Sequence, residues 1–305
     1  MTPSTGPLKH GGTALLAALL FAALSAYLLR DGFPADRVMI AGGSLEHSQP
    51  WAGHLAPPTP HNRFTVDQAR IFYPYLLEAA RVYRGEVDAL WTSRGGGGLP
   101  FLGNMTSSLL HPLTLLAAWL PTERVPLVQG LAVLTLSALF TFLFLRRLGV
   151  GLPSALCGAL AFGFGGHQVL WLQYALSHSL LALPFCFWAV ERLVEDRARR
   201  RVAVLALGFA LLVLGGHPET TWISGLVAGL WALYRLWDAH GRWLVVGTAL
   251  LGVGLSAVQW WPFLEYAVGS HGMVLRSLMA ARDAASLSWG AVIVFSICLD
   301  RKSVV

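Results

Sequence analysis

Long apolar stretches separated by polar connections run through the chain, beginning close to its N-terminus. Residues 13–29 are seventeen positions without a charge, and they follow Lys9 and His10. A stretch of this length and setting is typical of a signal peptide or of a first membrane-spanning helix. Because no small-residue cleavage motif ends it and several more apolar stretches follow, we expect an uncleaved helix whose N-terminus is cytoplasmic.

Six more apolar stretches are predicted to form membrane-spanning helices. The fourth and the fifth are short for crossing about 30 Å of hydrocarbon, and they meet at Gly215-Gly216-His217-Pro218. Glycine and proline interrupt helical hydrogen bonding, so this pair is expected to be a hairpin broken at that point. The six stretches are residues 127–145, 152–172, 174–190, 202–216, 220–234 and 243–264.

A long polar and aromatic segment, residues 31–126, separates the first helix from the others. Residues 71–83 have the pattern of an amphipathic helix, whereas residues 50–60 hold too many prolines for regular structure. Residues 109–120 are apolar, but these twelve positions include Pro112, end at Pro121 and are too few for a span. We expect an interfacial or re-entrant helix there.

The predicted fold class is an all-α polytopic membrane protein with a long first external loop that contains interfacial helices. Residues 286–299 are apolar but too few to span comfortably, and Asp300-Arg301-Lys302 follow them. This indicates a truncated eighth helix and an N-terminal part of a longer protein; a natural terminus with an interfacial tail is the alternative. The expected segments are residues 1–30, 31–126, 127–264, a second external loop at 265–285, and 286–305.

Composition and charge agree with this organisation. The chain is 55% hydrophobic and only 12% charged, against about 25% in ordinary soluble domains. With a cytoplasmic N-terminus, the cytoplasmic segments hold ten Lys and Arg residues and the external connections outside the long loop hold two, Arg276 and Arg282. The net charge of +6 is therefore a topology signal, and nucleic-acid binding is not expected. The ten are Lys9, Arg146, Arg147, Arg192, Arg197, Arg199, Arg200, Arg201, Arg235 and Arg242.

The three cysteines, Cys157, Cys186 and Cys298, lie inside apolar stretches without CxxC spacing. A disulfide framework or a structural zinc site is not indicated. They are expected to be small buried hydrophobic side chains.

Asp67 is the best catalytic candidate of the long loop, just ahead of the amphipathic helix. A carboxylate can take a proton from an attacking sugar hydroxyl or hold a hard divalent cation near a phosphate leaving group. In the alternative, Asp67 caps the helix or is simply solvated. The sequence leaves the cofactor unknown, with a divalent cation as the candidate.

Several polar side chains near helix ends fall on the predicted outer face, where ionisable groups are functional candidates. His217 could neutralise a phosphate and Glu219 could bind a sugar hydroxyl or a metal. Alternatively, Glu219 lies beside the helix dipole and His217 bonds to freed carbonyls. His167 and His178 are more often interfacial histidines bonded to water or backbone than site residues.

Trp91 is the tryptophan best placed to stack on a sugar ring, although tryptophans near helix ends usually form a belt at the lipid headgroups. The glycine run at residues 95–98 is not a phosphate-binding P-loop, because no Lys-Ser/Thr pair follows it. It is expected to be a flexible turn.

The loop resembles that of a known family. D-Q-x-x-x-x-Y-P from Asp67 to Pro74, Leu90-Trp91, Gly97-Gly98-Leu99-Pro100, Gly103-Asn104 and His111-Pro112-Leu113 are similar to the first external loop of YfhO-like bacterial membrane proteins. That family is related to the GT-C superfamily of glycosyltransferases that use polyprenyl-phosphate sugars. Residues 158–193 and Gly216-His217-Pro218-Glu219 are also similar, so the likeness covers residues 66–264, and family members are longer.

The resemblance implies a GT-C-like helical bundle that transfers a sugar from a polyprenyl phosphate to a cell-envelope glycan acceptor at the outer face of the membrane. It implies that an acid in the loop, Asp67, activates the acceptor or organises a metal; Asp36 lies nearer the first helix, so the choice between the two acids stays open. Arg63, Arg70 and Arg94 are phosphate partners by charge alone. The candidate substrate-binding residues are Gln68, Arg70, Tyr73, Trp91, Asn104, His111, His178, His217 and Glu219.

Two other classes of function remain open. A transporter or flippase for lipid-linked glycans would carry polar groups at mid-membrane on broken helices, and the predicted spans hold few of them. A non-catalytic membrane scaffold would tolerate changes to the loop.

Overall fold

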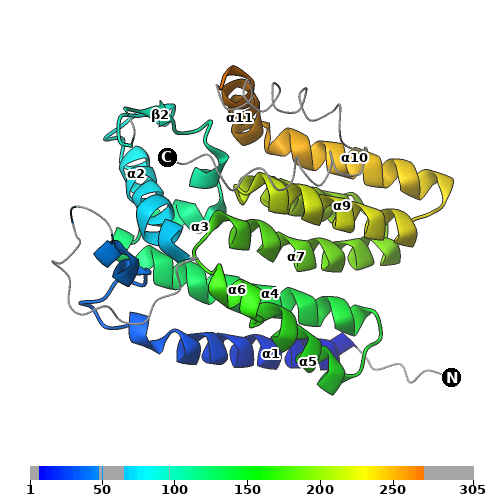
Figure 1. The fold of residues 1–305 in the computed structure, drawn as a ribbon. Coiled ribbons are helices and arrows are strands. Elements are labelled where there is room, and N and C mark those ends of the chain that lie inside the picture. Colours follow the sequence, from blue (N-terminus) through cyan, green and yellow to red (C-terminus); the bar gives the residue numbers. More distant parts are fainter. Residues whose placement is uncertain (1–6, 48–49, 51–64, 96, 271–305) are drawn as a thin grey trace, which may run out of the picture.

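The computed structural model describes residues 7–47, 50, 65–95 and 97–270, which form a helical bundle with a loop region at one end (Figure 1). The predictions for the proline-rich segment after Pro50 and for residues 271–305 lie outside the described residues. The prediction of a helical fold is confirmed in its coarse form, because the described part is mostly helical and has two short strands. The bundle helices are α1 (Pro7–Leu28), α4 (Val125–Arg147), α5 (Leu152–Gly163), α6 (Gly166–Leu170), α7 (Ala175–Glu195), α8 (Arg199–Leu214), α9 (Pro218–Arg235), α10 (Ala239–Leu255) and α11 (Ala257–Gly269).

Helix α7 lies at the centre of the bundle. It packs against α4, α8 and α9, while α1 and α5 lie against α4 and α10 lies against α8. Its buried face carries small side chains such as Ala182, Cys186 and Ala189, and small residues let helix backbones approach closely. At Gly208 of α8, a Cβ atom would lie 2.8 Å from the Cys186 sulfur, so the two helices meet there without space for a side chain.

Cysteine burial was predicted correctly at one position and wrongly at another. Cys186 is buried, whereas Cys157 is exposed on α5. Helix α5 packs on α4 through Ala155 and Ala159, so position 157 falls outside the packed face. Cys298 lies outside the described residues.

Two predicted continuous stretches are each divided into two helices. Residues 152–172 form α5 and α6, which are separated at Phe164 and Gly165, and Gly165 has extended backbone angles. Residues 243–264 form α10 and α11, which are bent by 74°. The Ser256 hydroxyl bonds back to the carbonyls of Gly252 and Val253, and such back-bonding bends helices.

The loop region is built from short elements that pack on one another. A π-helical turn, η4 (Gln68–Phe72), leads into α2 (Tyr73–Tyr83), as the amphipathic pattern predicted. Strands β1 (Trp91–Thr92) and β2 (Leu99–Pro100) pair antiparallel, with Trp91 opposite Pro100 and Thr92 opposite Leu99. The remaining turns are η1 (Arg30–Gly32), η2 (Gly42–His47), η5 (Met105–Ser107), α3 (Pro112–Leu115), η6 (Leu116–Ala118) and η7 (Thr122–Arg124).

The single helix expected at residues 109–120 is not formed. The chain makes the short helix α3 and the 3-10 turn η6 instead, and Leu109 and Ala117 are buried. A residue before proline avoids helical backbone angles, so His111 is extended and α3 begins only at Pro112.

The glycine run connects the two strands. Gly95, Gly97 and Gly98 have positive φ angles, which glycine adopts readily. A Cβ atom at Gly98 would lie 2.6 Å from the Trp91 ring. The run is therefore the turn that was predicted, and its last glycine makes room for Trp91.

By length and composition alone, one helix of the described chain, Thr122–Arg147, could cross a membrane. The bent pair Ala239–Leu255 and Ala257–Gly269 would be a second if counted as one span, and Gly12–Leu28 is apolar but shorter.

Candidate functional site

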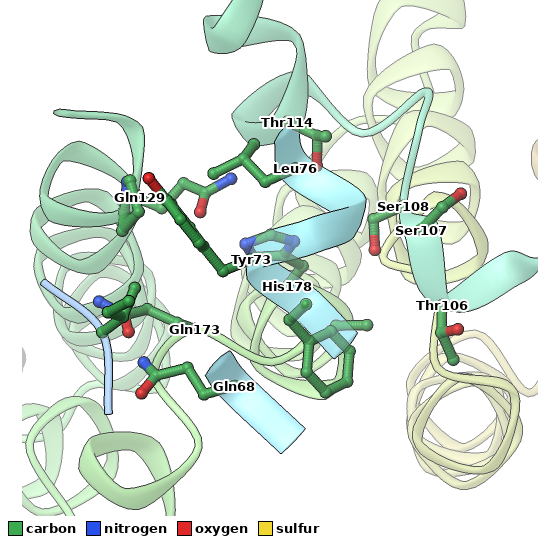
Figure 2. A pocket seen from close by; sticks show the side chains of 14 residues that line it. Gln68, Tyr73, Leu76, Thr106, Ser107, Ser108, Thr114, Gln129, Gln173 and His178 are labelled. Carbon is green, nitrogen blue, oxygen red and sulfur yellow. The ribbon is translucent and has the colours of Figure 1, made fainter. Parts of the chain in front are cut away.

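A small polar pocket lies where the loop region meets the ends of α4 and α7. The space that the centre of a water molecule can reach is about 30 Å³, enough for one or two waters. Figure 2 shows Gln68, Gln129 and Gln173 on one side, Thr106, Ser107 and Ser108 on the other, and His178 between them. The lining residues are Ile40, Gln68, Phe72, Tyr73, Leu76, Thr106, Ser107, Ser108, Thr114, Pro126, Gln129, Gln173, Ala175 and His178.

Gln68 ties three segments together at the edge of the pocket. Its side-chain oxygen accepts a hydrogen bond from the backbone N–H of Ala41 at 2.5 Å. Its own backbone N–H donates to the Tyr174 hydroxyl at 3.3 Å, and the ring of Phe72 lies 4.6 Å from that of Tyr174. These contacts hold the π turn against the segment that precedes α7.

Asp67 is exposed directly beside this anchored residue. It occupies the N-cap position of η4 but makes no capping hydrogen bond, so the capping alternative is not seen. It lies close enough to Tyr174 for its charge to act on the phenol. Asp67 is therefore an exposed acid next to an anchored residue that lines the pocket. Asp36, the competing acid, is exposed in a turn after η1.

The two histidines of the site lie against each other. The rings of His111 and His178 are parallel, with centroids 4.7 Å apart and an interplanar angle of 6°, and both residues are buried. The His111 Nδ1 accepts a hydrogen bond from the backbone N–H of Leu113, which caps α3. Burial, and then the neighbouring His178, hold the pKa of His111 well below its ordinary value.

His178 has unused hydrogen-bonding capacity. It is 5% exposed, and neither ring nitrogen has a partner among the described residues. The side-chain oxygen of Gln173, which also lines the pocket, is likewise buried without a partner. Buried polar groups are nearly always hydrogen-bonded, so these atoms point to water or a ligand group in the pocket.

The broken hairpin adjoins the pocket through Ser108. The Ser108 hydroxyl donates to the Gly215 carbonyl at 2.7 Å, and a Cβ at Gly216 would lie 2.3 Å from the same hydroxyl oxygen. His217 caps α9: its Nδ1 lies 2.8 Å from the Thr220 hydroxyl and accepts from the Thr220 N–H at 3.2 Å. Glu219 is in the first turn of α9, as the helix-dipole alternative expected.

The other predicted site residues are spread through the loop region. Tyr73 lines the pocket. Asn104 caps η5 by accepting from the N–H and the hydroxyl of Thr106. Trp91 is 53% exposed on β1, and Arg70 is exposed on η4. Arg63 lies outside the described residues.

Arg94, a predicted phosphate partner, lies near a buried acid that the sequence reading missed. Glu78 accepts a hydrogen bond from the Thr92 hydroxyl at 2.7 Å and pairs with Arg81 at 2.9 Å. Arg94 lies 3.7 Å from the same carboxylate. The signal in the sequence was an acid on the apolar side of an amphipathic helix. The contacts of Glu78 with Thr92 and Arg94 hold α2 against the β-hairpin.

Within the described ranges, no three His, Cys, Asp or Glu side chains converge on a point where a metal ion could be held. Comparisons with protein-family models, with curated proteins and with solved structures find no match. Function is therefore inferred from the residues and their arrangement.

Proposed function

We propose that the helical bundle is embedded in a membrane. On α9, the small residues Ser224, Ala228 and Ala232 face the core, while large apolar residues face outward. A soluble monomer seldom exposes apolar patches of this kind, and small residues at helix contacts are typical of membrane bundles. The exposed large apolar residues on three helices include Leu15, Leu16, Leu19 and Leu20 of α1, Trp222, Ile223, Leu226, Val227 and Leu230 of α9, and Val246, Leu250 and Leu251 of α10.

Arginine-rich connections lie at one end of the bundle and the loop region lies at the other, and this distribution supports a cytoplasmic N-terminus. Ion pairs Arg147–Glu195 and Arg197–Asp238 bring the α4–α5, α7–α8 and α9–α10 connections together at one end. The loop region lies at the other (Figure 1). Arginine-rich connections are typically cytoplasmic, so we infer that the loop region is external.

Within that membrane protein we propose a glycosyltransferase of GT-C type. It transfers a sugar from a polyprenyl phosphate to a cell-envelope glycan acceptor. The observation that carries the proposal is the position of Asp67: an exposed acid whose neighbour in the chain, Gln68, lines the polar pocket and is anchored by hydrogen bonds. A base beside such a pocket can reach a hydroxyl of an acceptor bound outside the bundle.

The neighbouring residues have roles that follow from their chemistry. Arg70, three residues along the same turn, supplies a positive charge for the departing phosphate. His178 and Gln173 offer buried hydrogen-bonding groups just inside the rim. The pocket itself is too small for a sugar ring, so the sugar and its phosphate bind at the rim and the pocket orders water beneath them.

The test uses the purified full chain, reconstituted in vesicles with a radiolabelled polyprenyl-phosphate sugar and an envelope glycan acceptor. Asp67→Asn is expected to lower transfer by about 10²-fold or more, while Asp36→Asn keeps the wild-type rate. If only Asp36→Asn loses sugar transfer, Asp36 is the catalytic acid and Asp67 is not. Undiminished transfer by both variants rejects the proposal.

Sidedness is measured separately. In a cysteine-free background, Asp67→Cys is expected to react with a membrane-impermeant maleimide in intact cells, and Arg200→Cys only after permeabilisation. The reverse pattern would place the loop in the cytoplasm and overturn the proposed transfer at the outer face.

A transporter of lipid-linked glycans is the second candidate, because one helix pair is broken beside a buried amide. Gln259, just after the α10–α11 bend, is fully buried and its side-chain oxygen has no partner among the described residues. Broken helices with polar groups are typical of transporters. Movement of a fluorescent lipid-linked glycan across vesicles, undiminished by Asp67→Asn and without sugar transfer, would favour this function.

A further inference from the structure

Four arginines from three helices gather at the bundle end opposite the loop. Arg147 ends α4, Arg192 lies near the end of α7, and Arg200 and Arg201 are in the first turn of α8. Their charges are close enough to repel one another. Like charges held together destabilise a site unless acids or a bound anion offset them.

The acids at this end offset only part of that charge. Glu195 pairs with both Arg147 and Arg201, the latter at 3.2 Å. Asp196 lies 3.5 Å from Arg201. Glu191, the third acid, is engaged by Arg235. Arg192 and Arg200 have no ion pair with these acids.

The first turn of α8 carries positive side chains, whereas a helix N-terminus is stabilised by negative ones. Helix N-termini carry unpaired N–H groups and a partial positive charge, which acids or anions stabilise. Helix α8 begins Arg199-Arg200-Arg201, has no acid in its first turn and has no side-chain cap at Ala198. Phosphate groups bind readily at such termini.

Arg192 is held against an aromatic ring at this end of the bundle. Its guanidinium lies over the ring of Trp188, 5.6 Å from the centroid. The Nε is covered by the protein, so an anion would meet the terminal N–H groups. Arginine guanidinium groups packed on aromatic rings are well suited to bind phosphate oxygens.

We propose that this arginine cluster, Arg147, Arg192, Arg200 and Arg201, binds the phosphodiester headgroup of an anionic phospholipid. Basic pockets between membrane helices on the cytoplasmic side bind such headgroups. A lipid is favoured over free phosphate because Tyr234, Trp237 and Trp243 are strongly exposed at the same bundle end, as in an aromatic belt at headgroup level. The inference rests on the membrane placement proposed above and is independent of sugar transfer.

The experiment is native mass spectrometry of the purified full chain, titrated in detergent with phosphatidylglycerol, phosphatidylcholine or inorganic phosphate. The wild type is expected to retain phosphatidylglycerol at least tenfold more tightly than phosphatidylcholine. Arg192→Gln with Arg200→Gln should weaken phosphatidylglycerol binding about tenfold. Arg200→Gln alone, at an exposed position, should give a smaller loss and cannot be explained by misfolding.

Arg242→Gln is the matched control, because Arg242 is at the same end but lies over the Trp237 ring, 5.5 Å from its centroid. Its phosphatidylglycerol binding should change less than twofold. Equal losses for Arg200→Gln and Arg242→Gln would show diffuse attraction by surface charge and overturn the site. Competition by inorganic phosphate at the lipid's own concentration would overturn the lipid as its ligand. The Asp67→Asn variant should bind phosphatidylglycerol as the wild type does, even if it loses sugar transfer. The lipid site and the proposed transfer activity can therefore fail separately.

Discussion

The imidazole rings of His111 and His178 stack in parallel, 4.7 Å apart, and join the loop region to the central helix α7. His111 also caps α3, so one side chain organises the loop and docks it. Neither ring can accept a proton without placing a charge against its neighbour in a buried site. The contact is therefore expected to depend on pH.

The first prediction concerns that dependence. Because the pKa of His111 is lowered by burial and by His178, the unfolded chain binds more protons than the folded chain once the pH falls below about 6.5. Stability is complete above that pH and is lost below it, by up to about 1.4 kcal/mol per pH unit until the folded pKa is reached. Thermal unfolding between pH 8 and pH 5 measures this.

His111→Asn is the informative variant, since asparagine can still cap α3 but does not titrate. Its melting temperature should fall less steeply with decreasing pH, whereas His111→Ala should in addition lose about 1 kcal/mol for the missing cap. His167→Asn, at an exposed position, should keep the wild-type slope. An unchanged slope in His111→Asn would contradict the assignment.

The second prediction concerns Glu78, which is 4% exposed. Glu78→Gln removes the charge that holds Arg81 and Arg94, and losing hydrogen bonds to a charged group typically destabilises by about 2 kcal/mol. The variant should melt at lower temperature and be cut faster by protease in the β-hairpin. Glu86→Gln, an exposed partner of Arg81 and Arg84, should change neither measurement.

The third prediction separates two effects of glycine in the hairpin turn. Gly97 and Gly98 both have positive φ, but only at Gly98 would a Cβ contact Trp91. Gly97→Ala should lose about 1 kcal/mol from backbone strain. Gly98→Ala should lose more and shift the Trp91 fluorescence. Equal effects on stability and fluorescence would show that the Trp91 contact is unimportant.

The fourth prediction concerns the buried Glu191 between α7 and α9. It accepts hydrogen bonds from the Arg235 Nε at 2.9 Å, the Arg235 Nη2 at 2.6 Å and the Trp231 Nε1 at 3.0 Å. Glu191→Gln should destabilise by about 3 kcal/mol because it leaves the Arg235 charge unpaired.

A double variant tests whether this loss comes from the pair. Arg235→Gln added to Glu191→Gln should recover part of the stability, as measured by a double-mutant cycle on thermal unfolding. Arg197→Gln, in the exposed pair with Asp238, should have no measurable effect. Strictly additive losses would show that Glu191 and Arg235 act separately.

Sequence patterns predicted those features that depend on near neighbours. Apolar length and the positions of glycine and proline placed α4 and α7, the break at Gly215 and the turn before Leu99, and an amphipathic pattern at residues 71–83 placed the helix that the structure shows as α2. These features follow from backbone preferences and local hydrophobicity, which a linear sequence contains. The division at Ser256 was missed, because a serine inside an apolar stretch bends a helix only when its hydroxyl bonds back to the preceding turn.

Local pattern alone therefore determined the mostly helical character of the described residues, the extent of the polar loop and the basic character of particular connections. Only the tertiary structure decided that His111 stacks on His178, that Glu78 bonds to Thr92, and that Arg147 and Arg192 lie close enough for their charges to interact. These pairs come from segments far apart in the chain, and each forms because packing brings two helix ends or turns to the same place. Asp67 depends on both: its sequence neighbours marked it as a candidate, whereas the hydrogen bond from the Gln68 N–H to the Tyr174 hydroxyl anchors the residue beside it.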